Sequence, residues 1–226
     1  MARKKDDAEF ICEYKIKDHK IITMEEEKRE RVIAAAFREF NKGYHLANLD
    51  EIAKKAGISK GLIFHYFGSK RGLFLFLIKY SLDIIIMEYR KVILESSDFL
   101  ENIRIVSKQK LEMFFRYPLM FGFLVKTYSD SAVKDVFPEG LPGDLPQSSP
   151  FIAVQLVRQR SNHDNMLFKD DIDSEKAQNI IMWTMHGYID SLFRYGDDVD
   201  AYKAHSEEML KELDEYLQIL RKILYR

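Results

Sequence analysis

The sequence is poor in the residues that interrupt helices or form disulfides. Its 226 residues include ten glycines, five prolines and one cysteine, Cys12. A single cysteine excludes a disulfide within the chain and a thiolate metal cluster, and it is consistent with a reducing compartment. Scarce glycine and proline, with plentiful Leu, Ile, Lys and Glu, favour helices over strands. We therefore expect an all-α protein.

Long apolar runs are also missing. The most apolar segment, LFLFLIKYSLDIIIM at 73–87, is interrupted by Lys79 and Asp83. It is shorter than the roughly 20 apolar residues of a membrane span, so it predicts a buried helix. Residues 1–23 lack an apolar core of signal-peptide length. These features predict a cytoplasmic protein with no membrane partner.

One stretch contains no acidic residue. Positions 53–80 hold six Lys or Arg and no Asp or Glu, in a chain whose net charge is −1. Residues 81–226 carry 18 basic and 24 acidic residues. A basic N-terminal part joined to an acidic body indicates that only the N-terminal part meets a polyanion.

Enzyme signatures are absent as well. The sequence has no nucleophile elbow, phosphate loop, paired metal motif or dinucleotide fingerprint, so we expect neither an enzyme nor a cofactor. His186 and Asp190 have a metal-compatible spacing of four, and His163 precedes Asp164, but neither pattern supplies a third ligand. We expect no metal site, and we interpret His186 as a polar group of a pocket or an interface.

Helical periodicity and capping residues organise the basic region. Apolar positions from Val32 to Phe40 share one face of a first helix, which ends near Asn41. Asn48 is placed to cap a second helix that ends at Gly57, and Ser59 is placed to cap a third. Residues 49–67 therefore predict two short helices joined by a tight turn, a helix-turn-helix.

The third helix presents two kinds of surface. Ile63 is expected to face the core with Phe67, four residues on. Lys60, Phe64 and His65 point elsewhere, on a surface that the basic stretch leaves without an acid. Such a surface matches a recognition helix in the major groove of DNA, with phosphate contacts at its edge.

The domain boundaries follow from these patterns. We expect a flexible arm at 1–23, a helix-turn-helix DNA-binding domain at 24–72, and a helical ligand-binding and dimerisation domain at 73–226. Four of the five prolines fall in 138–150 and predict a loop. Two long helices are predicted after it, at about 173–195 and 199–224.

The last two helices predict a partner. Apolar residues surround the helix at 177–193 almost completely, and such a helix must be covered on all sides. A two-fold homodimer would cover the second face, and the alternative is one monomeric bundle with this helix at its centre. The expected interface residues are Ile181, Met185, Tyr188, Leu192, Leu213, Leu217 and Leu220.

Met and aromatic residues of the C-terminal part are candidates for a ligand cavity. The same residues also suit an ordinary helical core, but as a group they favour an apolar or aromatic ligand. The expected pocket residues are Phe115, Phe121, Tyr128, Met182, Trp183 and His186.

Two stretches carry a family resemblance. RVIAAAFREFNKGY at 31–44 and LDEIAKKAGISKGLIFHYFGSKRGLF at 49–74 resemble the tetracycline-repressor (TetR) family of transcriptional regulators. The resemblance has a specific signature over about 30–77, and it extends to the rest only through the helical layout. It implies a homodimer that binds a pseudo-palindromic double-stranded DNA operator, with a C-terminal cavity whose ligand changes DNA binding.

The resemblance also implies roles for single residues. The positions that would face DNA are Ser59, Lys60, Gly61, Phe64 and His65. Those that would contact phosphates are Asn48, Tyr66 and Lys70. Where the family often has Tyr-Tyr-His, this chain has Phe64-His65-Tyr66, and a phenylalanine offers only apolar contact, for instance to a thymine methyl group.

Three functions remain open from the sequence. The leading one is a repressor released from its operator by a small, largely apolar effector. The second is a DNA-binding protein of the same fold that a protein partner controls. The third is a helical enzyme with a vestigial DNA-binding head, which would bind DNA weakly and with little salt dependence.

Overall fold

The protein is nearly all helical. A computed structural model describes residues 20–92, 95–129, 131–137, 157, 167–192 and 204–226. Within these ranges the only β-type pairing is an isolated bridge between Phe168 and Tyr225, so the expectation of an all-α fold is confirmed. None of the described helices is long and apolar enough to cross a membrane.

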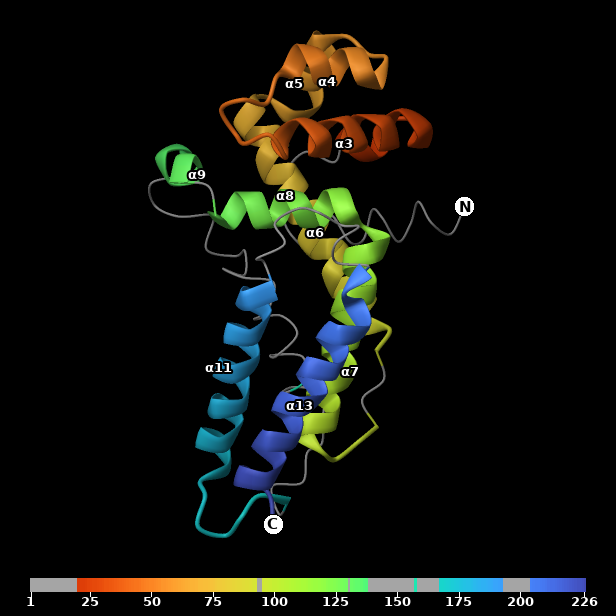
Figure 1. Cartoon of the computed structure of the whole chain (residues 1–226). Helices are drawn as coiled ribbons and strands as arrows, with labels where there is room; N and C mark the ends of the chain where they lie inside the picture. Colours follow the sequence, from red (N-terminus) through yellow and green to blue (C-terminus); the bar gives the residue numbers. More distant parts are fainter. Residues whose placement is uncertain (1–19, 93–94, 130, 138–156, 158–166, 193–203) are drawn as a thin grey trace. The chain divides into compact units, whose positions relative to one another are not determined.

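The chain divides into two compact units (Figure 1). The first comprises residues 1–84 and 119–145, and the second comprises residues 85–118 and 146–226. The helices with residues in the first unit are α2 (Lys20–Thr23), α3 (Glu26–Phe40), α4 (Leu49–Ala56), α5 (Lys60–Phe67), the larger part of α6 (Lys70–Arg90), α8 (Pro118–Ser129) and α9 (Ser131–Val136). The second unit contains α7 (Phe99–Arg116), α11 (Ser174–Leu192) and α13 (Ser206–Leu224).

The first unit extends beyond the predicted DNA-binding domain at both ends. Lys20–Thr23, at the end of the predicted arm, form α2, and Ile21 in this helix is buried. At the other end, most of α6 belongs to this unit together with α8 and α9. The predicted loop at 138–150 lies outside the described residues, and the functional boundary at 72/73 stays a prediction.

Aromatic side chains form the core of the first unit. The ring of Phe123 in α8 lies 5.3 Å from Phe37, 6.2 Å from Phe40 and 5.2 Å from Phe74, measured between centroids. These rings meet mainly edge to face, the arrangement that aromatic quadrupoles favour. Helices α3, α6 and α8 are therefore joined through one packed cluster.

In the second unit α13 provides a narrow apolar stripe. The buried residues of α13 are Met209, Leu213, Leu217, Leu220 and Leu224. Helix α13 packs on both α7 and α11, and in Figure 1 it runs beside α11. The hydroxyl of Tyr188 on α11 donates to the carbonyl oxygen of Met209 at 2.6 Å, and this contact fixes the two helices near one end.

Candidate nucleic-acid interface

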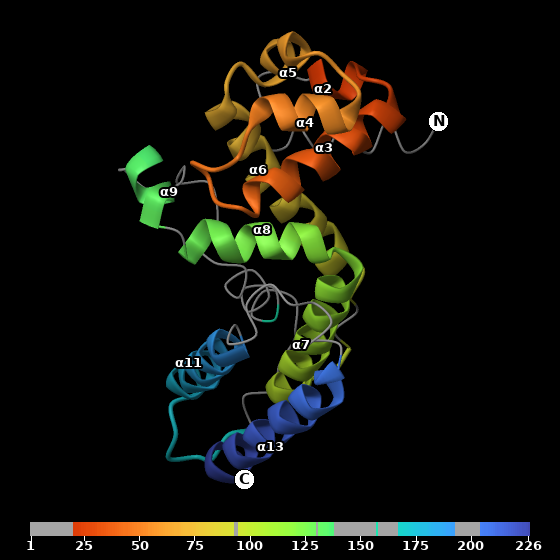
Figure 2. The ribbon, with the colours of Figure 1, turned by 45° about the horizontal axis from the view of Figure 1, so that its top comes forward.

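Helices α4 and α5 form the predicted helix-turn-helix. Local capping explains where each helix begins and where α4 ends. The Asn48 side chain accepts a hydrogen bond from the Asp50 amide at 2.8 Å, which caps α4. Gly57 ends α4 in the left-handed region at φ 68°. Ser59 then accepts from the Leu62 amide at 3.3 Å and caps α5. Figure 2 shows α3, α4 and α5 grouped together.

Most of the α5 surface is left uncovered by the chain itself. Ile63 is the one buried residue of α5 and anchors the helix. The predicted DNA-facing residues Ser59, Lys60, Gly61, Phe64 and His65 are all exposed. Phe64 is 43% exposed, which is unusual for a large apolar side chain next to a well-packed core.

Gly61 has no packing role within the described protein. A Cβ atom added there would meet only the Ser59 hydroxyl oxygen, at 3.9 Å. Glycine inside a helix is less stable than alanine by about 1 kcal/mol. The helix therefore keeps a destabilising residue on its exposed face, which is understandable if another molecule approaches the backbone there.

Lys60 has a counter-charge that the sequence reading missed. Its ammonium nitrogen lies 2.9 Å from Oδ2 of Asp50, in the first turn of α4. The expectation of a surface without an acid was therefore wrong at this position. The acid-free stretch begins at residue 53, and the carboxylate comes from just before it, across the turn between the helices.

Lys70 and Tyr66, predicted to contact phosphates, are both half-buried. The Lys70 ammonium donates to the carbonyl oxygen of His45 at 3.2 Å and lies 5.0 Å from the centre of the Tyr44 ring. Burial lowers the pKa of Lys70. The ring of Tyr66 packs edge to face on His65 at 5.1 Å. Neither side chain is freely extended into solvent.

A buried carboxylate fixes α4 on α3. Glu39 of α3 has no exposed side-chain surface and accepts hydrogen bonds from Lys42 at 2.7 Å and Lys55 at 2.8 Å. Burial alone would raise the pKa of Glu39, but the hydrogen bonds and charges of the two lysines outweigh it and hold that pKa below its usual range. Arg31 adds a second link, because its Nε donates to the Ala56 carbonyl oxygen at the end of α4.

The predicted interface residues are mostly buried inside the second unit. Six of the seven have side chains buried within the single chain on α11 or α13, and the side chain of Leu192 lies outside the described residues. The exposed apolar residues of these helices are instead Ile180, Trp183, Tyr216, Ile219 and Ile223.

The predicted pocket residues are scattered between the two units. Phe121 is buried in the first unit, whereas Phe115 and Met182 are half-buried in the second. Trp183 is 71% exposed. The side chains of Tyr128 and His186, and the whole of His163 and Asp164, lie outside what the structure describes. Among the described residues no group of three metal-binding side chains occurs.

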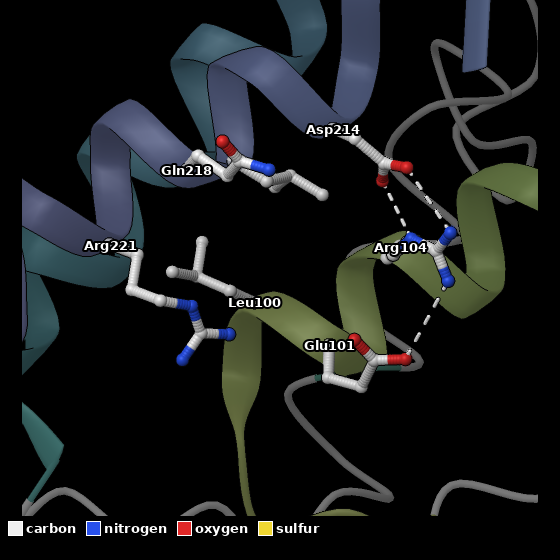
Figure 3. Close-up of a pocket in the computed structure, with 7 residues that line it drawn as sticks. Leu100, Glu101, Arg104, Asp214, Gln218 and Arg221 are labelled. Carbon is white, nitrogen blue, oxygen red and sulfur yellow. Dashed lines mark hydrogen bonds and ion pairs between the residues drawn. The ribbon is translucent and has the colours of Figure 1, made fainter. Parts of the chain in front are cut away.

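A groove lies between α7 and α13 (Figure 3). Its volume is about 220 Å³, and Arg104, Asp214, Gln218 and Arg221 are among its lining residues. Arg104 is already paired with Asp214 through two hydrogen bonds of 2.6 and 3.1 Å. Arg221 is paired with Asp98 at 2.5 Å. Because both guanidinium groups are occupied, this groove does not resemble an anion-binding site.

A known protein family matches the region that contains the helix-turn-helix. Residues 32–77 match the sequence pattern of the family described as "Bacterial regulatory proteins, tetR family". The N-terminal part of the chain therefore resembles the DNA-binding part of the TetR family. The match contains α4, α5, both caps and Lys70, so the predicted resemblance is confirmed.

Two named relatives match part of the chain. The "HTH-type transcriptional activator FasR" of Mycolicibacterium smegmatis is 32% identical over 80 residues, which is 35% of this chain and 36% of FasR. The "HTH-type transcriptional regulator BetI" of Yersinia pestis is 42% identical over 53 residues, 23% of this chain and 27% of BetI. The chain thus matches only about a third or less of each relative's length.

Solved structures extend the similarity to the fold. A TetR family transcriptional regulator from Chloroflexus aurantiacus superposes with a TM-score of 0.65 at 20% identity, over 91% of this chain and 97% of that one. CprB from S. coelicolor A3(2) gives a TM-score of 0.57 at 18% identity, over 89% and 91%. At these identities the likeness concerns the fold alone. The matched proteins are named as regulators and not as enzymes.

Proposed function

We propose that this protein is a transcriptional regulator of the TetR family that binds an operator in double-stranded DNA through α5 and responds to a small effector. The exposed face of α5 carries the proposal. Lys60, Gly61, Phe64 and His65 lie together on a capped helix, and nothing else in the described chain covers them. Lysine and histidine side chains can hydrogen-bond to base edges in the major groove, and a phenylalanine ring can contact a thymine methyl group. A glycine lets the helix backbone come close to the DNA.

We propose that the regulator works as a homodimer. Ile180 and Trp183 are exposed on α11, and Tyr216, Ile219 and Ile223 are exposed on α13, which packs beside it. Exposed apolar residues on two neighbouring helices favour burial against a second copy, and a two-fold copy presents the same surface in return. A dimer would place one head on each half of a palindromic operator.

The effector is the finer part of the proposal. We propose a small, largely apolar or aromatic compound that binds the C-terminal part and releases the operator, so that the protein is a repressor. Such a ligand must bind the released conformation more tightly, by the same free energy that DNA binding loses. The relative FasR is named an activator, and the direction of control therefore needs its own transcription assay. We expect the protein in the cytoplasm, where its DNA is.

Selection of DNA from a random pool tests the DNA-binding proposal. The purified protein is incubated with random 40-base-pair duplexes, and the bound duplexes are amplified and sequenced over several rounds. The proposal expects an enriched pair of inverted half-sites whose centres lie one helical turn apart, or a multiple of it. A Lys60→Gln/His65→Ala variant is the control and should not enrich the same pair. Enrichment of no motif by the wild-type protein would contradict the proposal.

Displacement by small molecules tests the effector. The enriched duplex is labelled, and its release is followed by fluorescence anisotropy during addition of apolar and aromatic compounds. The proposal expects at least one class to release the duplex at a saturating concentration. If instead only a protein fraction releases it, the protein-partner alternative is favoured.

A further inference from the structure

Lys60 is a basic residue on the exposed face of α5, and its ammonium group is paired with the Asp50 carboxylate. Both residues occupy first turns: Asp50 is the second residue of α4, and Lys60 is the first residue of α5. The 2.9 Å contact therefore spans the turn of the helix-turn-helix. It joins the first helix of the helix-turn-helix to the helix expected to read bases.

The backbone that carries the Asp50 carboxylate is held in place by local interactions. The Asp50 amide donates to the Asn48 side chain at 2.8 Å, so the backbone is held by the cap. A negative charge is also favourable in the first turn of α4, because the N-terminal end of a helix is positive. Asp50 is thus kept where it is by two local effects that do not involve Lys60.

The pair leaves Lys60 able to bind DNA. A lysine ammonium group has three donors, and Asp50 uses one of them. The Lys60 and Asp50 side chains are 47% and 64% exposed, so the remaining donors can reach solvent. A free lysine side chain is flexible and equally able to contact any phosphate. A tethered one is restricted to a small volume beside the N-terminal turn of α5.

We propose that Asp50 is a positioning residue for DNA specificity. It holds the Lys60 ammonium group for hydrogen bonding to base-edge acceptors, such as guanine N7 and O6, and away from the phosphates. This inference rests on the proposed DNA-binding function. Base contacts specify sequence whereas phosphate contacts do not, so restricting Lys60 favours the operator over other DNA. The carboxylate also repels phosphates and weakens binding to every sequence.

The test compares four proteins on two probes. The proteins are the wild type, Asp50→Asn, Lys60→Gln and the double variant. The probes are the duplex enriched by the wild-type protein and a shuffled duplex of the same base composition. Affinity is measured over a salt series by fluorescence anisotropy. Circular dichroism melting checks that each variant folds, and Asp50→Glu, which keeps the charge, serves as the conservative variant.

Asp50→Asn should bind the shuffled duplex more tightly, by about fivefold, the strength of an exposed ion pair. Its salt slope on that duplex should be steeper by about 0.9, because the freed lysine adds one phosphate contact. Its preference for the enriched duplex should fall by a similar factor. Asp50→Glu should keep most of the preference. In the Lys60→Gln background, Asp50→Asn should strengthen binding to both duplexes equally and leave the preference unchanged.

Three results decide against the proposal. An unchanged or increased preference in Asp50→Asn overturns it, and so does an equal loss of preference in the Lys60→Gln background. If the wild-type protein shows no preference for any duplex, the proposed DNA-binding function itself fails. That last outcome is seen in the wild-type measurement alone, so the two failures are distinguishable.

Discussion

The Lys70 ammonium group donates a hydrogen bond to the carbonyl oxygen of His45, 3.2 Å away, and lies over the Tyr44 ring. This contact ties the first turn of α6 to the loop before α4. Burial lowers the pKa of Lys70, and the lysine keeps two further donors for a phosphate. The residue therefore joins a structural role to its predicted DNA contact.

Replacing Lys70 should weaken binding to all DNA. In Lys70→Met we expect affinity to fall by about the same factor, roughly tenfold, on the enriched and the shuffled duplex, with a salt slope smaller by about 0.9. Lys211→Met, which removes a charge from the exposed side of α13, is the control and should leave the slope unchanged. A changed sequence preference with an unchanged slope would show that Lys70 reads bases.

Replacing Gly61 should change stability and DNA binding in opposite directions. Because a Cβ there would meet only Ser59, Gly61→Ala should stabilise the protein by about 0.5–1 kcal/mol in urea unfolding. It should also weaken operator binding, since the added methyl group stands on the surface that approaches DNA. Gly57→Ala is the matched control. Its φ of 68° disfavours a side chain, so it should destabilise the protein by about 1 kcal/mol. Unchanged operator affinity in Gly61→Ala would remove the glycine from the interface.

The ion pairs of Glu39 predict a pH-dependent stability. Its pKa is lower in the folded protein than the ordinary value of 4.5, so its contribution is present above pH 4.5 and is lost as the pH falls through the folded pKa. Glu39→Gln should lower the free energy of unfolding at pH 7 by about 1–3 kcal/mol, and the difference from wild type should shrink at acid pH. A difference independent of pH would show that lost packing, not charge, is responsible.

The exposed face of α11 and α13 predicts the oligomeric state. Ile219→Asp should convert the dimer to a monomer in sedimentation velocity, and it should weaken operator binding by about a hundredfold because two linked heads become one. Gln218→Lys, one residue away but lining the α7 groove, should remain dimeric. Trp183 is the single tryptophan, and its emission should shift to the red on dissociation. A wild-type protein that is monomeric at micromolar concentration would contradict the proposed interface.

The features of the site that the sequence predicted correctly are those that depend on a few neighbouring residues. The caps at Asn48 and Ser59 and the left-handed turn at Gly57 each need only a few consecutive residues, and all three are in the structure. The Asp50–Lys60 and Lys70–His45 contacts depend on how separate segments cross, and no periodicity encodes that. The predicted tight turn brings the first turns of the two helices together. A search for an acidic residue in the first turn of the preceding helix, ten residues before Lys60, could therefore have found Asp50.

The last two helices show a similar limit. Periodicity predicted an α11 that is apolar nearly all round, but not which side the chain itself covers. In the structure Ile181 is buried and its neighbour Ile180 is exposed, and Met185 is buried while Trp183 is exposed. Which face is covered depends on tertiary packing, such as the contact of α11 with α13, and not on periodicity.

The affinity of the wild-type protein for its enriched duplex, relative to the shuffled duplex, tests the central claim most directly. The account predicts a preference of about a thousandfold or more near 150 mM salt, with a steep loss of affinity as salt increases. Equal affinity for the two duplexes with a shallow salt dependence would contradict it, and α5 would not be a DNA-reading helix.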